Sequence, residues 1–479
     1  MKNKVAIIGG GTYQPIYNHV GLCSFAKGGT ARKLAWMFMD TKLEPELYLS
    51  KMAKGPQMWE TARFMERNVG VRLNAFHTND DLQELVNELK ADPETKVIIL
   101  SAAVVDYTCD WGDDELERPT VKVGGGITVP LTKASKIVQS IRDDEHKHIF
   151  LVAFKQTCGK TPKEMYLAGL KLCKEASVNL VFVNDTITRH NMIVTPEEAT
   201  YADGYSRDAA LEELKEMTVA RSHLSFTRST VIAGHPIPWD SKLVPDTLRT
   251  VVDYCRKQGA YKAFNGATVG HFACKLAPTE FLTSIRRSNF NDLHKEGLVK
   301  VTTDGPDNVT AYGAKPSVGG QSQRIIFDAH PELDSIVHFH CPMREDHRDD
   351  IQVQSQRDVE CGSHECGQNT ANGLKQFGNL WAVYLHKHGP NIVFPSTIDP
   401  QEVIDFIDAN FDLLQKTGGY NLEEVSERLM EAFAPTFEKL AKYDKDCPWC
   451  GSLPGEECAE GCDATEFVCT HPKGRLAEV

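Results

Sequence analysis

The chain has 479 residues, of which 41% are hydrophobic and 25% are charged, and its formal net charge is −13. This length exceeds what one hydrophobic core usually organises, so we expect two large domains and a smaller appendage. The composition is typical of globular proteins and excludes the disordered and membrane classes. The negative charge would repel nucleic acid and anionic lipid, and no basic patch offsets it, so we expect neither as a partner.

The N-terminus and the cysteine usage predict a cytoplasmic protein. The first apolar run, residues 5–9, is too short for a signal peptide and is typical of a strand. Of the 14 cysteines, nine are scattered from Cys23 to Cys366 and five crowd into residues 447–469. Without a secretory signal the scattered cysteines do not indicate disulfides, and the cluster indicates metal binding.

The first part of the chain alternates short apolar runs with amphipathic stretches. Strands are expected at residues 5–8, 97–100, 149–152 and 180–183, and helices at residues 31–39, 81–89 and 163–174. This alternation predicts an α/β domain over residues 1–195, with a Rossmann-like parallel sheet covered by helices on both faces.

The remainder of the chain divides into three predicted segments. Residues 196–243 are rich in turn formers and are predicted to be a linker, residues 244–442 a second α/β domain, and residues 443–479 the appendage. In the second domain, helices are expected at 244–257, 321–329, 369–377, 400–415 and 422–442, and strands at 281–283, 299–302, 336–339 and 380–385.

A glycine run, Gly9, Gly10 and Gly11, follows the first expected strand and precedes Thr12. Missing side chains let backbone N–H groups approach phosphate oxygens, and the threonine hydroxyl adds a donor. A tight strand-to-helix turn is an equally common reason for such a run. The run has neither the Walker lysine spacing nor the dinucleotide fingerprint.

Polar residues also follow other expected strands of this domain. Asp106 lies after one strand, and Asn184 and Asp185 end another. Ligands of open parallel sheets bind at the carboxyl ends of the strands, where these side chains would converge. Between them, Lys122 precedes a run of three glycines and could reach over a site, although a solvated loop lysine is the more common role.

Together these segments resemble phosphopantothenoylcysteine synthetase, the phosphopantothenate–cysteine ligase of coenzyme A biosynthesis, over residues 4–191. The resemblance rests on the glycine-rich start and on residues 102–107, 122–126, 131–137, 154–157 and 183–185. It implies that CTP or ATP, with Mg²⁺, activates a carboxylate as an acyl-nucleotidylate and releases pyrophosphate. An amine then attacks to form an amide.

The resemblance also implies roles for individual residues. Lys122 would neutralise charge on the acyl phosphate, which favours a preorganised cation, and Asp106 would be a second catalytic residue. The nucleotide and the acyl group would contact Gly9, Gly10, Gly11, Thr12, Ser24, Phe154, Lys155, Asn184 and Asp185. Ser24 stands where the family has an asparagine, which predicts an acid other than phosphopantothenate.

Three histidines in the second domain have the pattern of metal ligands. His338 and His340 are two residues apart in an expected strand, so their imidazoles point to the same face. His388 follows the strand expected at 380–385 and precedes Gly389. A single histidine is more often a hydrogen-bonded core or surface residue, but three imidazoles with an open fourth position suit zinc or another divalent metal. Three nearby histidines are predicted to be bystanders or to contact the ligands: His347, His364 and His386.

This domain resembles the class II aldolase/adducin family over residues 244–414. The resemblance rests on residues 281–284, 297–305, 315–317, 330–340, 362–363 and 383–389, in the family's order. It implies an α/β/α fold, metal ligands at the three histidines, and lyase, epimerase or dehydratase chemistry on small sugar phosphates, in which the metal polarises a carbonyl.

Two positions depart from the aldolase pattern. Gly319 stands where the family has the acid that transfers a proton, and Val318 where it has a phosphate-binding serine. Glycine cannot transfer a proton, so ordinary aldolase chemistry is not expected. The sequence offers three candidates for a replacement acid: Glu345, Asp346 and Glu365.

The appendage resembles a short zinc ribbon. Cys447 and Cys450 are spaced so that both sulfurs face one ion, and Cys458 with Cys469 or His471 would complete the site. The alternative is a redox-active or merely exposed cysteine pair. Acidic residues surround these ligands, so we expect a structural or protein-contacting role.

The sequence therefore predicts a bifunctional biosynthetic enzyme, an amide ligase fused to a metal-dependent lyase or epimerase, which takes small-molecule substrates and assembles as a homo-oligomer. Two alternatives stay open. Gly319 and Ser24 favour a scaffold or regulatory protein whose modules have lost catalysis, or a protein with one active module. The retained histidines and Lys122 favour the enzyme.

Overall fold

A computed structural model of the chain describes residues 3–17, 20–109, 129, 131–143, 145–264, 266–304 and 308–417. The chain divides into one compact unit, Met1–Tyr420, and a second unit, Asn421–Val479. The predicted zinc ligands of the appendage, the helix expected at 422–442 and Lys122 all lie outside the described residues. Among the described helices, none is long and apolar enough to cross a membrane.

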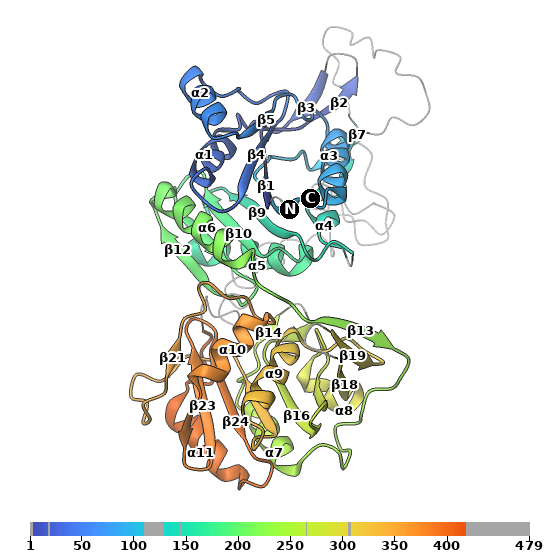
Figure 1. The fold of residues 1–479 in the computed structure, drawn as a ribbon, viewed down its shortest axis with the longest axis vertical. Coiled ribbons are helices and arrows are strands. Elements are labelled where there is room, and N and C mark those ends of the chain that lie inside the picture. Colours follow the sequence, from blue (N-terminus) through green and yellow to red (C-terminus); the bar gives the residue numbers. More distant parts are fainter. Residues whose placement is uncertain are drawn as a thin grey trace, which may run out of the picture. The chain divides into compact units, whose positions relative to one another are not determined.

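The first module is built on an eight-stranded sheet with the order β12-β11-β10-β9-β6-β1-β4-β5 (Figure 1). Its parallel strands are β1 (Lys4–Gly9), β4 (Glu44–Leu49), β5 (Gly70–Arg72), β6 (Thr95–Leu100), β9 (Phe150–Thr157) and β10 (Leu180–Asp185). Counted along the chain, these strands have the spatial order 3-2-1-4-5-6, which is the Rossmann arrangement. Strands β11 (Asn191–Val194) and β12 (Thr200–Gly204) extend the sheet in antiparallel fashion.

The helices of the first module are α1 (Gly29–Phe38), α2 (Met58–Glu66), α3 (Asn79–Ala91), α4 (Ile137–Ile141), α5 (Pro162–Ala176) and α6 (Arg207–Arg221). Two short hairpins, β2 (Tyr13–Tyr17) with β3 (Val20–Cys23) and β7 (Tyr107–Cys109) with β8 (Leu131–Lys133), follow β1 and β6. Helices α3 and α5 start at the capping boxes of Thr78 and Thr161. Successive residues of β1 from Val5 to Ile8 are fully buried, as expected for a parallel sheet covered on both faces.

Residues 196–243, for which the sequence suggests a linker, are divided between the two modules instead. They supply strand β12 and helix α6 to the first module, and strand β13 (Arg228–Ile232) to the sheet of the second. The many polar residues of α6 weaken its apolar periodicity, so the sequence did not predict this helix. Its buried residues nevertheless belong to the core of the first module: Ala210, Leu211, Leu214 and Met217. We therefore divide the described chain into a first module up to residue 227 and a second module from residue 228.

The second module contains a sheet with the order β13-β19-β18-β17-β16-β20-β24-β23-β21, and β22 pairs with β23. Its remaining strands are β16 (His271–Ala277), β17 (Glu280–Ser284), β18 (Leu298–Asp304), β19 (Asn308–Tyr312), β20 (Ser335–His338), β21 (Val353–Gln354), β22 (Lys375–Phe377), β23 (Leu380–Leu385) and β24 (Gly389–Phe394). A separate hairpin joins β14 (Ala263–Phe264) and β15 (Ala267–Thr268). The central strands β16, β20, β24 and β23 are antiparallel to their neighbours in this series.

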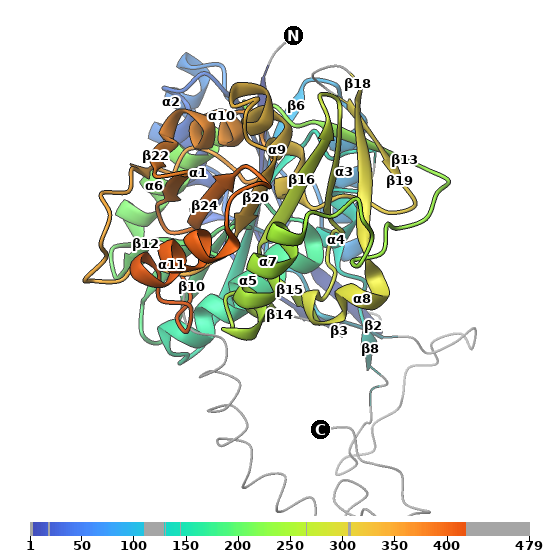
Figure 2. The same cartoon turned by 90° about the horizontal axis from the view of Figure 1, so that it is seen from below.

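Helices cover both faces of this second sheet (Figure 2). Helices α7 (Asp246–Lys257) and α11 (Pro400–Asn410) pack with Val337 on one face, and α9 (Val318–Ala329) and α10 (His364–Gly373) pack with Ile336 on the other. The short helices η1 (Phe290–Asp292) and α8 (Leu293–Glu296) precede β18. This arrangement confirms the predicted α/β/α class of the second module.

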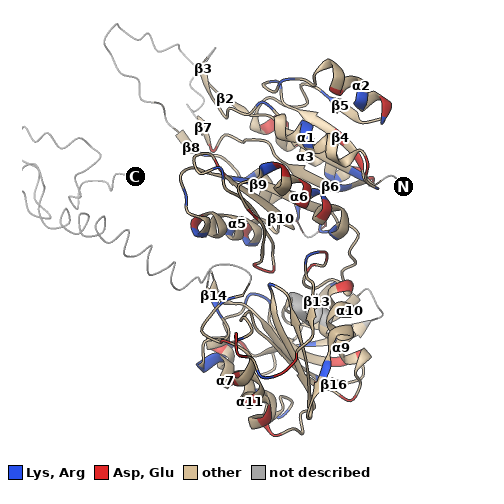
Figure 3. Ribbon diagram, turned by 90° about the vertical axis from the view of Figure 1, so that its left-hand side faces the viewer, with Lys and Arg blue, Asp and Glu red and all other residues tan. Residues whose placement is uncertain are grey.

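Charged residues of both signs are interspersed along the described helices and loops (Figure 3). Helices α5 and α6, for example, carry residues of both signs.

Candidate functional site

Three imidazoles converge at the end of the central strands of the second sheet. His338 ends β20, His340 follows two residues later, and His388 lies in the turn between β23 and β24. One ring nitrogen from each residue lies within 4.8 Å of the other two, and all three residues are buried. The three histidines predicted from spacing are therefore brought together.

Glycine at position 389 permits this approach. Gly389 has φ 136°, and a Cβ atom at this position would lie 2.1 Å from the carbonyl oxygen of Phe339. No other residue fits there without moving a backbone. The His-Gly pair in the sequence is thus a steric requirement for bringing the His388 turn against the end of β20.

Hydrogen bonding and burial prepare the imidazoles as ligands. His338 Nδ1 donates to the carbonyl oxygen of Pro390 at 2.7 Å, which leaves Nε2 as the unprotonated nitrogen. That Nε2 lies 3.3 Å from Nε2 of His388. Burial, followed by the neighbouring histidines, lowers the pKa of both residues well below the usual value. Neutral imidazoles whose lone pairs face a common point fit a divalent metal.

A fourth buried histidine borders the cluster. His271 begins β16 opposite His338, with the two ring centroids 4.7 Å apart, and its Nδ1 lies 2.5 Å from the amide nitrogen of Gln323. Burial lowers the pKa of His271 to about 3. Gln323 follows Gly319 by one helical turn on α9, so both positions share a helix face. The Oε1 atom of Gln323 is buried, with no hydrogen-bond partner in the part of the chain that the structure describes.

A carboxylate reaches the cluster from the first module. Glu198 Oε2 accepts a hydrogen bond from His340 Nδ1 at 3.3 Å and pairs with Lys416, and Glu198 Oε1 lies 3.2 Å from Lys174 Nζ. The Glu198 side chain is fully buried. Burial raises its pKa, but Lys416, Lys174 and His340 outweigh that effect and hold the pKa well below the usual value. Glu198 is therefore an anion beside a candidate metal ligand.

None of the three acids suggested by the sequence takes this position. Glu345 and Asp346 are exposed, and Asp346 accepts a hydrogen bond from Arg344. Glu365 accepts hydrogen bonds from the backbone N–H of Ser225 instead. Sequence reasoning missed Glu198 because it precedes His340 by 142 residues and lies in the segment assigned to a linker.

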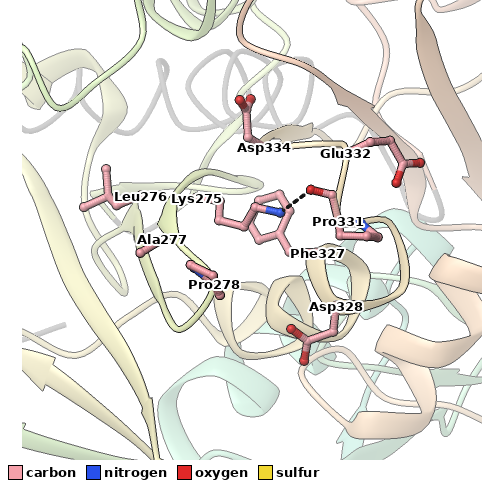
Figure 4. Close-up of a pocket in the computed structure, with 9 residues that line it drawn as sticks. All are labelled: Lys275, Leu276, Ala277, Pro278, Phe327, Asp328, Pro331, Glu332 and Asp334. Carbon is pink, nitrogen blue, oxygen red and sulfur yellow. Dashed lines mark hydrogen bonds between the residues drawn. The ribbon is translucent and has the colours of Figure 1, made fainter.

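A pocket of about 510 Å³ lies elsewhere in this module, at the opposite end of β16 from His271 (Figure 4). Its lining includes Lys275, which donates to the carbonyl oxygen of Pro331 at 2.7 Å and lies over the ring of Phe327. Lys275 follows His271 by four positions of extended strand, so about 13 Å separate the pocket from the histidine cluster. The pocket is therefore not the substrate site of the histidine cluster.

In the first module, the loops after β1 and β6 run side by side. The backbone N–H of Ala103 donates to Gly10 at 2.9 Å, and that of Thr12 donates to Ala103 at 3.0 Å. Strands β1 and β6 are the neighbours from which the Rossmann sheet extends in opposite directions. Ligands of such sheets bind in the crevice at this point.

The glycine run makes these loops compact. A Cβ atom at Gly11 would lie 1.7 Å from the carbonyl oxygen of Ser24, and Gly10 has φ 104°. The buried Thr12 hydroxyl donates to Asn79 Oδ1 at 2.7 Å and accepts from the backbone N–H of Val105 at 2.9 Å. The hydroxyl predicted as a phosphate donor therefore anchors the loop after β6.

The remaining predicted ligase residues play different parts. Asp185 is buried and accepts hydrogen bonds from Thr157 and from four backbone N–H groups, of residues 159, 160, 187 and 188. Burial raises its pKa, but these donors outweigh that effect and lower it. Asp185 thus holds together the loops after β9 and β10. The neighbouring Asn184 is half-buried. Asp106 is exposed and pairs with Lys136 at 2.5 Å. Phe154 packs on Phe182 and Lys155 is exposed.

The two modules correspond to two known domain families. Residues 58–228 match the model of the DNA/pantothenate metabolism flavoprotein C-terminal domain. Residues 249–344 match the class II aldolase and adducin N-terminal domain. The chain thus joins a domain similar to phosphopantothenate–cysteine ligases to a class II aldolase-like domain, as the sequence predicts. A comparison with curated protein sequences gave no match.

Solved structures resemble each half of the chain. The DNA/pantothenate metabolism flavoprotein from Streptococcus pneumoniae is 18% identical, with a TM-score of 0.36, over 45% of this chain and 96% of that one. The C-terminal domain of a coenzyme A biosynthesis bifunctional protein is 20% identical, with a TM-score of 0.34, over 45% and 95%. An L-fuculose 1-phosphate aldolase is 17% identical, with a TM-score of 0.27, over 34% and 82%.

Proposed function

We propose that the chain is a bifunctional enzyme, in which a divalent-metal-dependent lyase or epimerase is fused to a nucleotide-dependent acid–amine ligase. The observation that carries this proposal is the buried cluster of His338, His340 and His388. Three buried imidazoles whose ring nitrogens lie within 4.8 Å of one another are costly to a core unless a ligand uses their lone pairs. A scaffold that had lost catalysis would not need to keep them.

In the lyase half, His338, His340 and His388 would hold a zinc ion or another divalent metal. Such a metal, when bound, polarises a carbonyl oxygen of the substrate. The carbonyl of Pro390 orients the His338 ring by accepting the hydrogen bond that its Nδ1–H group donates. Gln323 and His271 offer polar groups that would orient a small carbonyl or sugar-type compound beside the cluster.

Proton transfer in this half departs from that of ordinary aldolases at Gly319. Gly319 supplies no acid, and Gln323 lies one turn later on the same face of α9. An amide donates and accepts hydrogen bonds but does not transfer a proton at neutral pH. We therefore propose a substrate that is oriented by this amide, while proton transfer falls to a group other than the usual helix carboxylate.

In the ligase half, the loops after β1 and β6 would form the floor of a nucleotide site for CTP or ATP with Mg²⁺. Backbone N–H groups of the glycine run and the half-buried Ser24 and Asn184 would contact the nucleotide and the acyl group. Lys122 would neutralise the acyl phosphate. Because Ser24 replaces an asparagine, we propose an acid that differs from phosphopantothenate.

Metal analysis of the purified full chain tests the central claim. The wild type should retain zinc, cobalt or manganese that His338→Ala loses, after subtraction of any metal held by the cysteines of the appendage. Pyrophosphate release, measured with each nucleoside triphosphate and a panel of acids and amines, tests the ligase half. A wild type with no metal at the histidines would instead support a scaffold.

A further inference from the structure

The turn between β11 and β12 of the first module contacts the histidine cluster of the second module. Glu198 lies in this turn, and its carboxylate contacts His340 and Lys416, both from the second module. Lys174, on α5 of the first module, lies on the other carboxylate oxygen. The fully buried carboxylate is thus shared between two modules of different families.

The backbone of the turn is adapted to this position of Glu198. The residue has φ 70°, a left-handed conformation that usually takes glycine or asparagine. The backbone carbonyl of Glu198 accepts a hydrogen bond from the Tyr166 hydroxyl at 2.9 Å, and Lys174 donates to the carbonyl of Pro196 at 2.8 Å. A strained glutamate that the surrounding structure holds in place indicates a functional requirement for its side chain.

Buried contacts between the modules keep the turn in register with the histidines. Arg221 is fully buried, pairs with Glu197 and donates to the carbonyl oxygens of Gln356 and Arg357, both at 2.9 Å. Lys387, next to His388, donates to the carbonyl oxygen of Thr200 at 2.7 Å. These contacts lie on both sides of Glu198 in sequence, so the carboxylate is held by a rigid frame.

We propose that Glu198 is the outer carboxylate of the metal centre, so that the ligase-like module completes the site of the aldolase-like module. This inference rests on the proposed metal site. His340 Nδ1 donates to Glu198, which leaves Nε2 of His340 for the metal. A carboxylate behind a ligating histidine fixes the ring and makes the ligand more basic. Glu198 is therefore a positioning residue. Among the described carboxylates, it alone accepts a hydrogen bond from a histidine of the cluster.

Cobalt binding to the full chain tests the proposal, because the visible spectrum of Co²⁺ reports the ligand field directly. Glu198→Gln should lower the affinity for Co²⁺ by about 10- to 100-fold and alter that spectrum. Glu198→Asp should restore part of the affinity. Glu360→Gln is the matched control, since Glu360 is also a buried carboxylate between the modules, bonded to Asn179, and it should bind Co²⁺ as the wild type does.

A second variant protects the test against misfolding. Glu198→Gln leaves Lys416 without its partner, whereas Glu198→Gln/Lys416→Met removes the buried pair together, which proteins tolerate better. The double variant should fold and still show the weaker affinity and altered spectrum. Wild-type affinity and spectrum in both variants would overturn this proposal alone. A wild-type chain that binds no Co²⁺ at the histidines would overturn the proposed metal site as well.

Discussion

The two candidate sites of this chain use their polar groups in opposite ways. At the histidine cluster, buried nitrogens of His338 and His388 face each other at 3.3 Å, with their lone pairs available to a cation. At the carboxyl edge of the first sheet, the polar atoms of Thr12 and Asp185 are engaged by the protein itself. The second module therefore has a preorganised candidate site for a small cation, whereas the loops of the first module are held together by their own hydrogen bonds.

This difference explains which kinds of ligand each module suits. A metal ion needs convergent lone pairs within a few ångströms, and side chains provide them. A nucleotide is larger, and backbone N–H groups with exposed side chains bind its phosphates from one side. Substitutions should therefore act on single ligands in the second module and through loop geometry in the first.

Loss of one histidine should have the largest effect. We expect His388→Ala to lower metal affinity by more than about 100-fold. Only two imidazoles remain, and a residue that binds the metal directly contributes more than a residue that hydrogen-bonds to a ligand. Equilibrium dialysis with zinc or cobalt measures this change. His386→Ala, two residues earlier and outside the cluster, is the control and should bind metal normally. Equal binding by the two variants would contradict the site.

The glycine run should be sensitive to a single methyl group. Gly11→Ala places a Cβ atom 1.7 Å from the carbonyl oxygen of Ser24, so a backbone must move, at a cost of about 1–3 kcal/mol in the free energy of unfolding. Urea unfolding measures this change. Gly29→Ala is the matched control, because no atom lies within 4 Å of its added Cβ. Metal affinity should stay unchanged in both variants. A lower metal affinity in Gly11→Ala would contradict the independence of the two sites.

The sequence predicted those features of the two sites that are formed by residues close together in the chain. The His-x-His pair and the His-Gly turn after strand β23 are each formed by residues adjacent in sequence. Spacing therefore singled out His338, His340 and His388 as candidate metal ligands, and the structure brings these three residues together. Residues 102–107 and the glycine run likewise indicated the edge of the first sheet. The family models confirm both modules.

The missing parts of the site depend on contacts between distant segments. Glu198 meets His340 across 142 residues, and His271 meets Gln323 across 52. No periodicity or spacing signals such a pair. Helix α6 was missed for another reason, since its buried Ala210, Leu214 and Met217 alternate with many charged residues. Glu198 and helix α6 lie at the interface between the modules and the His271–Gln323 pair lies inside the second module, and in each case tertiary packing decides the contact.

The interface should show a pH dependence of its own. Burial, and then the charge of Glu197, raises the pKa of Glu360 to about 7, although Arg142, Arg221 and Asn179 oppose this. Since the unfolded value is near 4.5, the stabilisation by neutral Glu360 is complete below pH 4.5 and is lost as the pH rises through 7. Glu360→Gln should therefore gain roughly 1–3 kcal/mol relative to the wild type between pH 4.5 and pH 8.

Urea unfolding of both proteins at pH 5 and pH 8 measures this gain. Glu213→Gln serves as the control, because its carboxylate is partly exposed and pairs with Arg357 outside the buried group. A difference between Glu360→Gln and the wild type that is equal at the two pH values would contradict the raised pKa. The gain would show that the buried Glu360 carboxylate at the interface costs stability at neutral pH.

The smallest effect on stability should come from Asp106. Its pair with Lys136 is exposed, with side-chain exposures of 67% and 57%, so Asp106→Asn should change the free energy of unfolding by less than about 0.5 kcal/mol. Asp208→Asn, in the exposed pair with Lys33, is the control. Because the fold is unaffected in both variants, a fall of more than about tenfold in pyrophosphate release by Asp106→Asn alone would report a role in catalysis. Equal rates would leave Asp106 as an exposed pairing partner and move the search for the ligase chemistry to the backbone of the glycine loops.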